Sequence, residues 1–254
     1  MPLPRSFVLV AWANAWLAGE VSVDEVTDAL RAEPSAGIAH HVHAADPLAL
    51  GVLDSTDAEP LSVALGALRR AGTRRFGLAL PVPGDPLGLA GPRGFTERAV
   101  DVGEAVICEG AGLGLVPHAV GAGVQWAASA ADAGWPDDLS EADGRLATAV
   151  TAAAGGALTG DRPADTGLAG AEIAARIRAA GRLRRDALPP GAPARATRLV
   201  ARAGTCLALV EFGRPDVPGA AALPPPVLRE LSAAARRALV AAADACRAGR
   251  STEA

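Results

Sequence analysis

Three of the chain's four histidines lie close together, at His40, His41 and His43. Alternate residues of a β-strand share a face, so a strand over this segment would point His41 and His43 to one side and His40 to the other. A His-x-His pair on a strand can hold zinc, which also needs a third ligand and an open position for water. The pattern therefore allows a metal-assisted hydrolase, in which a metal-activated water is the nucleophile.

Four side chains are available as the third ligand: Asp46, Asp54, Asp85 and His118. No second His-rich element and no Cys-x-x-Cys pair selects among them. For this alternative we take zinc as the metal and Asp85 or His118 as the third ligand. Histidines that are solvated or hydrogen-bonded at the surface remain the simpler interpretation.

A second candidate site is the loop over residues 83–92, which contains Gly84, Asp85 and Gly88. It follows an expected buried strand, and loops at strand ends often bind ligands because glycines let backbone N–H groups approach an anion. Two prolines remove donors, no P-loop lysine is present, and Asp85 would repel an anion. We keep the three residues as ligand-binding candidates, with a rigid, turn-rich connection as the alternative.

The third candidate is a surface of arginines on expected helices. Residues 170–205 hold 8 Arg and 2 acidic residues, whereas residues 1–169 carry a net charge of −11. Helical spacing predicts two basic stripes, formed by Arg178, Arg182 and Arg185 and by Arg195, Arg198 and Arg202. Such stripes could contact nucleic-acid phosphates. The chain is acidic overall, so we expect contacts within the protein or with a protein partner, and nucleic acid is an unlikely partner.

The composition removes several kinds of chemistry. The chain has no lysine and no tyrosine, which excludes an internal Schiff base, a pyridoxal phosphate attachment and a phenolic acid or base. Its serines, including Ser55 and Ser62, lack the G-x-S-x-G context of a nucleophile elbow. Glu97, Asp101 and Glu104 are close in sequence, but nothing pairs their carboxyl groups. The sequence therefore leans away from an enzyme.

The cysteines and one apolar run indicate the cellular compartment in which we expect the protein. Cys108, Cys206 and Cys246 are odd in number and far apart, which favours reduced, buried thiols over disulfides. The apolar run over residues 7–18 is shorter than the roughly 20 residues that cross a membrane. We interpret it as a buried amphipathic helix rather than a signal peptide. A cytoplasmic protein without a membrane partner is expected.

The elements predict an α+β fold with a small mixed or antiparallel sheet and helices in the N-terminal half, followed by a helical C-terminal half. Residues 1–135 form the α+β region and residues 136–254 the helical region, and the two could pack as one domain. Ser22 and Glu25 form a capping box for a helix that ends near Ala32. The other expected helices cover residues 5–18, 61–71, from about 96, 138–154, 169–185, 194–211 and 227–247. The expected strands cover residues 37–43, 76–82, 104–108, 113–117 and 124–128.

Several segments together resemble a group of uncharacterised actinobacterial proteins over most of the chain. They are Trp12-Ala-Asn-Ala-Trp-Leu17, Ala39-His-His41, Gly77-Leu-Ala-Leu-Pro-Val-Pro-Gly-Asp-Pro86, Gly103-Glu-Ala-Val106 and Gly112-Leu-Gly-Leu-Val-Pro117. The resemblance implies a bacterial origin and carries no reaction, cofactor or site.

Our first prediction is a non-catalytic cytoplasmic protein that binds a protein or small-molecule partner without a cofactor. The zinc-dependent hydrolase and the nucleic-acid-associated protein stay open as alternatives.

Overall fold

The computed structural model describes residues 3–32, 39–53, 57–134, 138–159, 187–212 and 223–248. Its contacts divide the chain into two compact units. The first, here the α+β unit, comprises Pro2–Pro136, Ala187–Ala192 and Ala243–Ala254. The second, here the helical unit, comprises Met1, Asp137–Asp186 and Pro193–Ala242. The predicted α+β class is confirmed.

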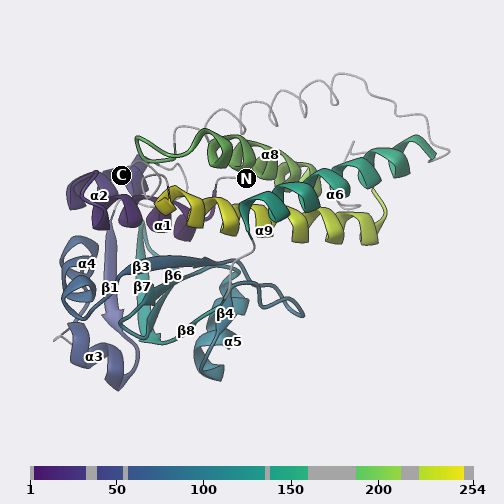
Figure 1. The fold of residues 1–254 in the computed structure, drawn as a ribbon. Coiled ribbons are helices and arrows are strands. Elements are labelled where there is room, and N and C mark those ends of the chain that lie inside the picture. Colours follow the sequence, from purple (N-terminus) through teal and green to yellow (C-terminus); the bar gives the residue numbers. More distant parts are fainter. Residues whose placement is uncertain are drawn as a thin grey trace. The chain divides into compact units, whose positions relative to one another are not determined.

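A six-stranded mixed sheet forms the centre of the α+β unit (Figure 1), with the strand order β2-β1-β7-β6-β5-β3. Its strands are β1 (His40–Ala44), β2 (Glu59–Pro60), β3 (Arg75–Ala79), β5 (Ala105–Glu109), β6 (Leu113–Val120) and β7 (Gly123–Ala130). β1 and β7 run parallel, and the other neighbours are antiparallel. A separate pair joins β4 (Leu89–Ala90) to β8 (Asp132–Ala133).

Five helices are described in the same unit: α1 (Arg5–Leu17), α2 (Val23–Ala32), α3 (Pro47–Leu53), α4 (Leu61–Arg70) and α5 (Arg93–Val102). The predicted capping box at the start of α2 is confirmed. Ser22 N–H donates to Oε2 of Glu25 at 2.7 Å, and Glu25 N–H donates to Oγ of Ser22 at 3.2 Å. These bonds satisfy two backbone donors that the first helical turn otherwise leaves unpaired.

Helix α1 is buried on most sides, from Ser6 to Ala11 and from Ala13 to Ala15. This differs from the amphipathic helix that we expected. Asn14 on α1 hydrogen-bonds both backbone groups of Phe76 on β3, which is an end strand of the sheet. The helix therefore covers a sheet edge, and a helix packed in this way needs apolar residues on more than one side.

Helix α5 packs on one face of the sheet, and Figure 1 draws it beside β4 and β8. Its Phe95 and Ala99 belong to a buried cluster with Ile107 and Val116 of the sheet. The ring of Phe95 lies over Gly114, where a Cβ would also come within 2.8 Å of the Cβ of Ala131. The missing side chain at Gly114 is what lets the aromatic ring approach the strand.

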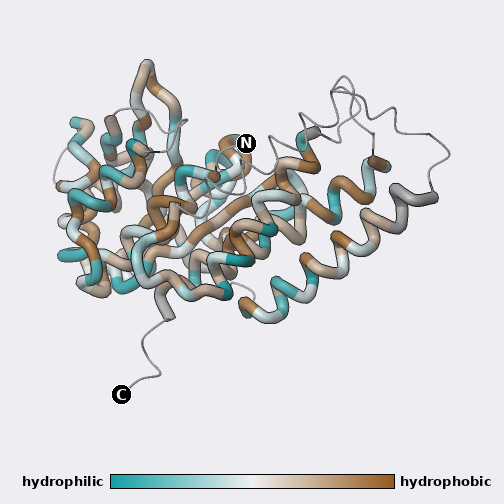
Figure 2. Tube along the Cα trace, turned by 90° about the horizontal axis from the view of Figure 1, so that it is seen from above, coloured by the Kyte–Doolittle hydropathy of each residue, from teal (hydrophilic) through white to brown (hydrophobic). Residues whose placement is uncertain are grey.

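The helical unit contains α6 (Leu139–Thr159), α8 (Ala194–Phe212) and the greater part of α9 (Pro225–Ala248), which run side by side (Figure 1). Hydrophobic and hydrophilic residues alternate along these helices (Figure 2). Asp138 begins α6 as predicted, since its Oδ1 accepts the N–H of Ser140 at 2.7 Å. Among the residues that the structure describes, no helix is both long and apolar enough to cross a membrane.

Some boundaries differ from the sequence prediction. β3 ends at Ala79 rather than Val82, because the chain turns back and Leu80 N–H donates to the carbonyl of Leu87 at 3.2 Å. α5 begins at Arg93, directly after Pro92, rather than near Thr96. α3 was not predicted. Asp46 caps this short helix by accepting the N–H of Ala49 at 2.9 Å. The expected helix over residues 169–185 lies outside the described residues.

Candidate functional site

The three neighbouring histidines divide between the two faces of β1, as the alternation predicted. His40 and Val42 are buried on one face, whereas His41 and His43 are half-buried on the other. The strand pairing extends the second face to β7 and β6. His41 is opposite Gln125, which is opposite His118, so these side chains share one row and one face.

The proposed metal ligands are only partly brought together. His118 is on the same face as His43 and, after burial, contributes to lowering the pKa of His43. Asp46 is occupied elsewhere, because its two oxygens accept the N–H groups of Ala49 and Ala130. Asp54 lies outside the described residues. Within the described ranges, no group of three or more His, Cys, Asp or Glu side chains could hold a metal ion.

Asp85 is far from the histidine pair. It follows β3, which is separated from β1 by β7, β6 and β5. Four steps between adjacent strands amount to roughly 19 Å. The set His41, His43 and Asp85 is therefore not a ligand set in this fold.

The loop that contains Gly84, Asp85 and Gly88 closes on itself. Val82 and Asp85 exchange backbone hydrogen bonds of 3.0 and 2.9 Å. Gly84 and Gly88 both have a φ of 82°, which favours glycine. A Cβ on Gly88 would come within 2.7 Å of the Leu78 carbonyl oxygen. Backbone geometry and packing thus account for these glycines, and the N–H groups of Val82 and Asp85 are used within the turn.

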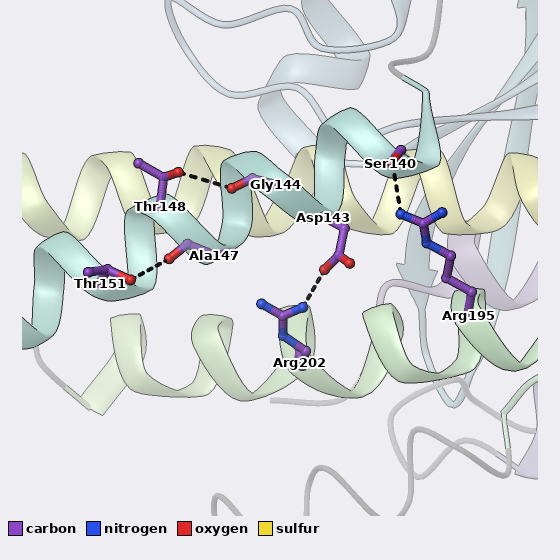
Figure 3. Close-up of polar contacts among 8 residues, drawn as sticks. All are labelled: Ser140, Asp143, Gly144, Ala147, Thr148, Thr151, Arg195 and Arg202. Atoms are coloured by element: carbon purple, nitrogen blue, oxygen red, sulfur yellow. Dashed lines mark hydrogen bonds and ion pairs between the residues drawn. The ribbon is translucent and has the colours of Figure 1, made fainter.

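The basic stripe on α8 contacts α6 of the same unit (Figure 3). Arg195 Nη2 donates to Oγ of Ser140 at 2.8 Å, and Arg202 forms an ion pair with Asp143. Arg198 is exposed on α8. The other predicted stripe, Arg178, Arg182 and Arg185, lies outside the described residues. Arg195 and Arg202 therefore both contact polar side chains of α6.

A cavity of about 330 Å³ lies between α2, the start of β1 and the start of α4. Ligand-binding pockets commonly begin at about this size. The polar side chains that line it are Asp24, Thr27, Asp28, Arg31, His40 and Ser62. Four of them lie on one face of α2 at helical spacing, while Val26 and Leu30 bury its opposite face. The capping box sets the residue at which α2 begins, and it therefore helps to position the polar face of α2 that lines the cavity.

His40 has a defined orientation and proton position in this cavity wall. Nε1 of Trp126 donates to Nδ1 of His40 at 3.2 Å, and the two ring centroids are 6.2 Å apart. An indole N–H only donates, so Nδ1 of His40 accepts and the imidazole proton is on Nε2. Trp126 is fully buried, which holds this pair in place.

The charges around the cavity are predominantly negative. Asp28 Oδ1 accepts from Arg31 Nη1 at 3.1 Å, so this pair is close to neutral. Asp24 adds a further carboxylate in the first turn of α2, where the helix dipole stabilises negative charge. The cavity thus combines a net negative charge with the hydroxyl groups of Thr27 and Ser62 and the imidazole of His40.

Sequence reasoning did not identify this cavity. Its walls come from segments that are distant along the chain, and no local pattern predicts that α2 lies opposite His40. The sequence feature that pointed towards the cavity was the strand alternation, which placed His40 on the face opposite His41 and His43. That assignment was correct, but it did not identify Trp126 as the partner of His40.

Comparison with known proteins gives two adjoining family matches. Residues 6–141 match the model described as Rv1486c-like protein, N-terminal domain, and residues 140–240 match the Rv1486c-like protein, C-terminal domain. The first match alone covers more than half of the chain.

Similar proteins occur in mycobacteria. The chain is 40% identical over 126 residues to "Uncharacterized protein Rv1486c" of Mycobacterium tuberculosis, covering 44% of this chain and 43% of that protein. It is 37% identical over 127 residues to "Uncharacterized protein MAV321" of Mycobacterium avium, covering 44% of this chain and 42% of that protein. The matched region thus spans less than half the length of each relative. No solved structure matches significantly.

Proposed function

This chain belongs to the Rv1486c-like protein family, whose matched members carry no named activity, and we propose that it is a non-catalytic protein that binds a small polar molecule. The proposed site is the cavity between α2, β1 and α4, here called the α2 cavity. The ligand we propose carries an amino group.

The hydrogen bond from Trp126 to His40 is the observation that supports a binding role over catalysis. Ser62, His40 and Asp28 all line the α2 cavity, and these residue types also form hydrolytic triads. A triad needs Nε2 of histidine to accept the serine proton while Nδ1–H donates to the carboxylate. In His40 the proton is on Nε2, so this nitrogen cannot accept a proton from Ser62 and the imidazole does not have the tautomer of a triad base.

The charge of the cavity supports the ligand class. Asp24 and Asp28 supply two carboxylates against the single guanidinium of Arg31. A protonated amine would balance the excess negative charge, and charge-assisted hydrogen bonds to carboxylates are stronger than neutral ones. Thr27 and Ser62 add hydroxyl groups that can orient the rest of a polar ligand.

The cysteines support a reducing compartment, and we propose that the protein acts in the cytoplasm. Cys108, Cys206 and Cys246 are all free thiols. Burial raises the pKa of each thiol, and that of Cys246 reaches about 12 with further contributions from Asp244 and Glu20. Protonated thiols are poor nucleophiles and form disulfides slowly.

The binding proposal can be tested by NMR titration of the whole chain with a panel of small amines and amino acids. Neutral and anionic analogues at matched ionic strength complete the panel. We expect amines to shift the resonances of α2 and the start of α4, and Asp24→Asn to weaken their binding. Asp101→Asn is the matched control, because Asp101 is an exposed acid on α5 away from the cavity. If no amine shifts these resonances, the proposed ligand class is wrong.

The proposal that the protein is non-catalytic can be tested separately. Long-range ¹H–¹⁵N spectra of the histidine rings report which nitrogen of His40 carries the proton. We expect Nδ1 to be unprotonated and Nε2 to be protonated. A protonated Nδ1, or turnover of a panel ester that is lost in His40→Gln, would overturn the proposal and favour a hydrolase.

A further inference from the structure

The face of the sheet opposite His40 carries histidine side chains and is reached by Arg98, and none of these forms a salt bridge to an acidic side chain of the described ranges. Three successive rows of this face contain His41, Gln125 and His118, then His43 and Ala127, then Ser129. Arg98 reaches the last row from α5, where its Nη2 donates to Oγ of Ser129 at 2.6 Å.

Arg98 is a half-buried guanidinium with an unused donor. Its Nε is buried, and no hydrogen-bond partner for that atom exists among the residues that the structure describes. Among the described residues, its hydrogen-bond partner is the neutral hydroxyl of Ser129. Buried cations in proteins are normally paired with an anion, because desolvation of an unpaired charge is costly.

His43 brings a second unused nitrogen to the same region. In the described part of the chain, nothing hydrogen-bonds to its buried Nδ1. His43 is opposite Ala127, and Ser129 is the next residue of β7 on that face. Such diagonal neighbours have Cα atoms about 7–8 Å apart, within reach of an arginine or histidine side chain. The small side chain of Ala127 lies between them.

The nearby carboxylates have other partners. Both oxygens of Asp46 accept backbone N–H groups, and Glu97 pairs with Arg93 at 2.6 Å. Helix α3, which contacts β1 and β7, contains no charged residue. Within the described residues, neither of these carboxylates forms an ion pair with Arg98. Burial and, to a smaller extent, His118 lower the pKa of His43.

We propose that Arg98, His43 and Ser129 bind a phosphate group, either as inorganic phosphate or as part of a small phosphomonoester. Nε–H of Arg98 and Nδ1–H of His43 donate to the phosphate oxygens. Ser129 accepts from Arg98, so its own hydroxyl hydrogen can donate to the same phosphate. Guanidinium groups suit this role because their N–H donors match the geometry of phosphate oxygens. The site is independent of the α2 cavity.

The test is a titration of the whole chain with inorganic phosphate and, separately, with glycerol phosphate, at an ionic strength fixed with sodium chloride. We expect resonances of Ser129, the His43 ring and α5 to shift. Arg98→Gln and Ser129→Ala should each weaken binding, the arginine change by about tenfold or more. Arg93→Gln is the matched control, because Arg93 is on the same helix with a side chain that is 90% exposed.

The affinities for the two ligands distinguish the two phosphate sources. If glycerol phosphate binds more tightly than inorganic phosphate, the site binds a phosphomonoester. If it binds equally or more weakly, the site binds free phosphate. If Arg98→Gln fails to fold, Ser129→Ala and His43→Gln carry the test. Equal phosphate affinity in wild type and in the folded variants would overturn the proposal, as would shifts that sodium chloride alone reproduces.

Discussion

Asn14 hydrogen-bonds the backbone of Phe76 in both directions across the edge of the sheet. Its Nδ2 donates to the Phe76 carbonyl at 2.8 Å, and the Phe76 N–H donates to its Oδ1 at 2.8 Å. A side-chain amide thus satisfies the two groups that a further strand would otherwise pair. Asn14 is also the chain's single asparagine.

We predict that Asn14→Ala lowers the free energy of unfolding by about 2–4 kcal/mol, because it leaves both buried backbone groups of Phe76 without a partner. Urea denaturation followed by circular dichroism measures the change. Thr27→Ala is a control at a half-buried helical position outside the sheet, and it should alter stability by less than about 1 kcal/mol. A near-neutral Asn14→Ala would mean that water reaches this sheet edge.

Glu104 predicts a dependence of stability on pH. Burial raises the pKa of its carboxyl group, and the N–H of Ser6, which donates to Oε2 at 2.7 Å, opposes this only in part. The folded state therefore holds the proton more tightly than the unfolded state. The stabilising contribution is complete below the ordinary pKa of 4.5 and is lost as the pH rises through the folded value.

In Glu104→Gln the buried charge is removed, while an amide oxygen can still accept from Ser6. We expect wild type to lose stability relative to Glu104→Gln as the pH rises from about 4.5 towards neutrality. Chemical denaturation of both proteins across this pH range measures the difference. A stability difference that is constant with pH, or that changes in the opposite direction, would contradict the raised pKa.

The effects on stability of substitutions at Gly114 and at Phe95 should depend on each other. In Gly114→Ala the new methyl group would overlap the Phe95 ring, which we expect to cost about 1–3 kcal/mol. Phe95→Leu alone should also destabilise the unit, because it removes part of a buried ring. The double variant should be more stable than the sum of the two single effects predicts, since the smaller side chain makes room for the methyl group. Strict additivity would show that the strand moves away from α5 instead.

Arg75 joins two acidic side chains in the α+β unit. Its Nη2 lies 3.2 Å from Oε1 of Glu109 and 3.0 Å from Oδ1 of Asp244. Arg75→Met should lower the free energy of unfolding by about 1–2 kcal/mol, because two half-buried carboxylates then lose their ion pair with the same guanidinium. The exposed pair of Arg93 and Glu97 supplies the comparison, and Arg93→Met should have a smaller effect. Equal effects of the two changes in thermal denaturation would rule out a special role for Arg75.

Local sequence patterns predicted those parts of the fold that depend on neighbouring residues. The capping box of Ser22 and Glu25 and the alternation of His40 and His41 involve residues at most three apart, so the sequence alone contains them. The strands expected over residues 104–108 and 113–117 were predicted from local patterns as well, and they form the adjacent pair β5 and β6.

The parts that sequence patterns could not predict depend on distant pairings. Trp126 and His40 are 86 residues apart, and Arg98 reaches Ser129 from another element. Asp85 was considered a ligand for His41 because its residue type suited a metal, but the strand order separates the two. Residue type therefore identified the candidate site residues, whereas the strand order determined which of them lie close together.

The place of helix α9 near the end of the sequence determines when the α+β unit can be completed during translation. Its last residues, from Ala243 to Ala248, belong to the α+β unit, as do residues 187–192, where the Ala187 carbonyl accepts from Nε1 of Trp12 at 2.9 Å. A ribosome makes about 5–20 residues per second, so Asp244 follows the last strand of the sheet by roughly 5–20 s. During that interval the nascent sheet lacks Asp244, one of the two acidic partners of Arg75, and for part of it also the Ala187 carbonyl that accepts from Trp12. Chaperones and proteases thus meet an incomplete first unit, and a premature stop near the 3′ end of the message would damage the part of the protein that was translated first.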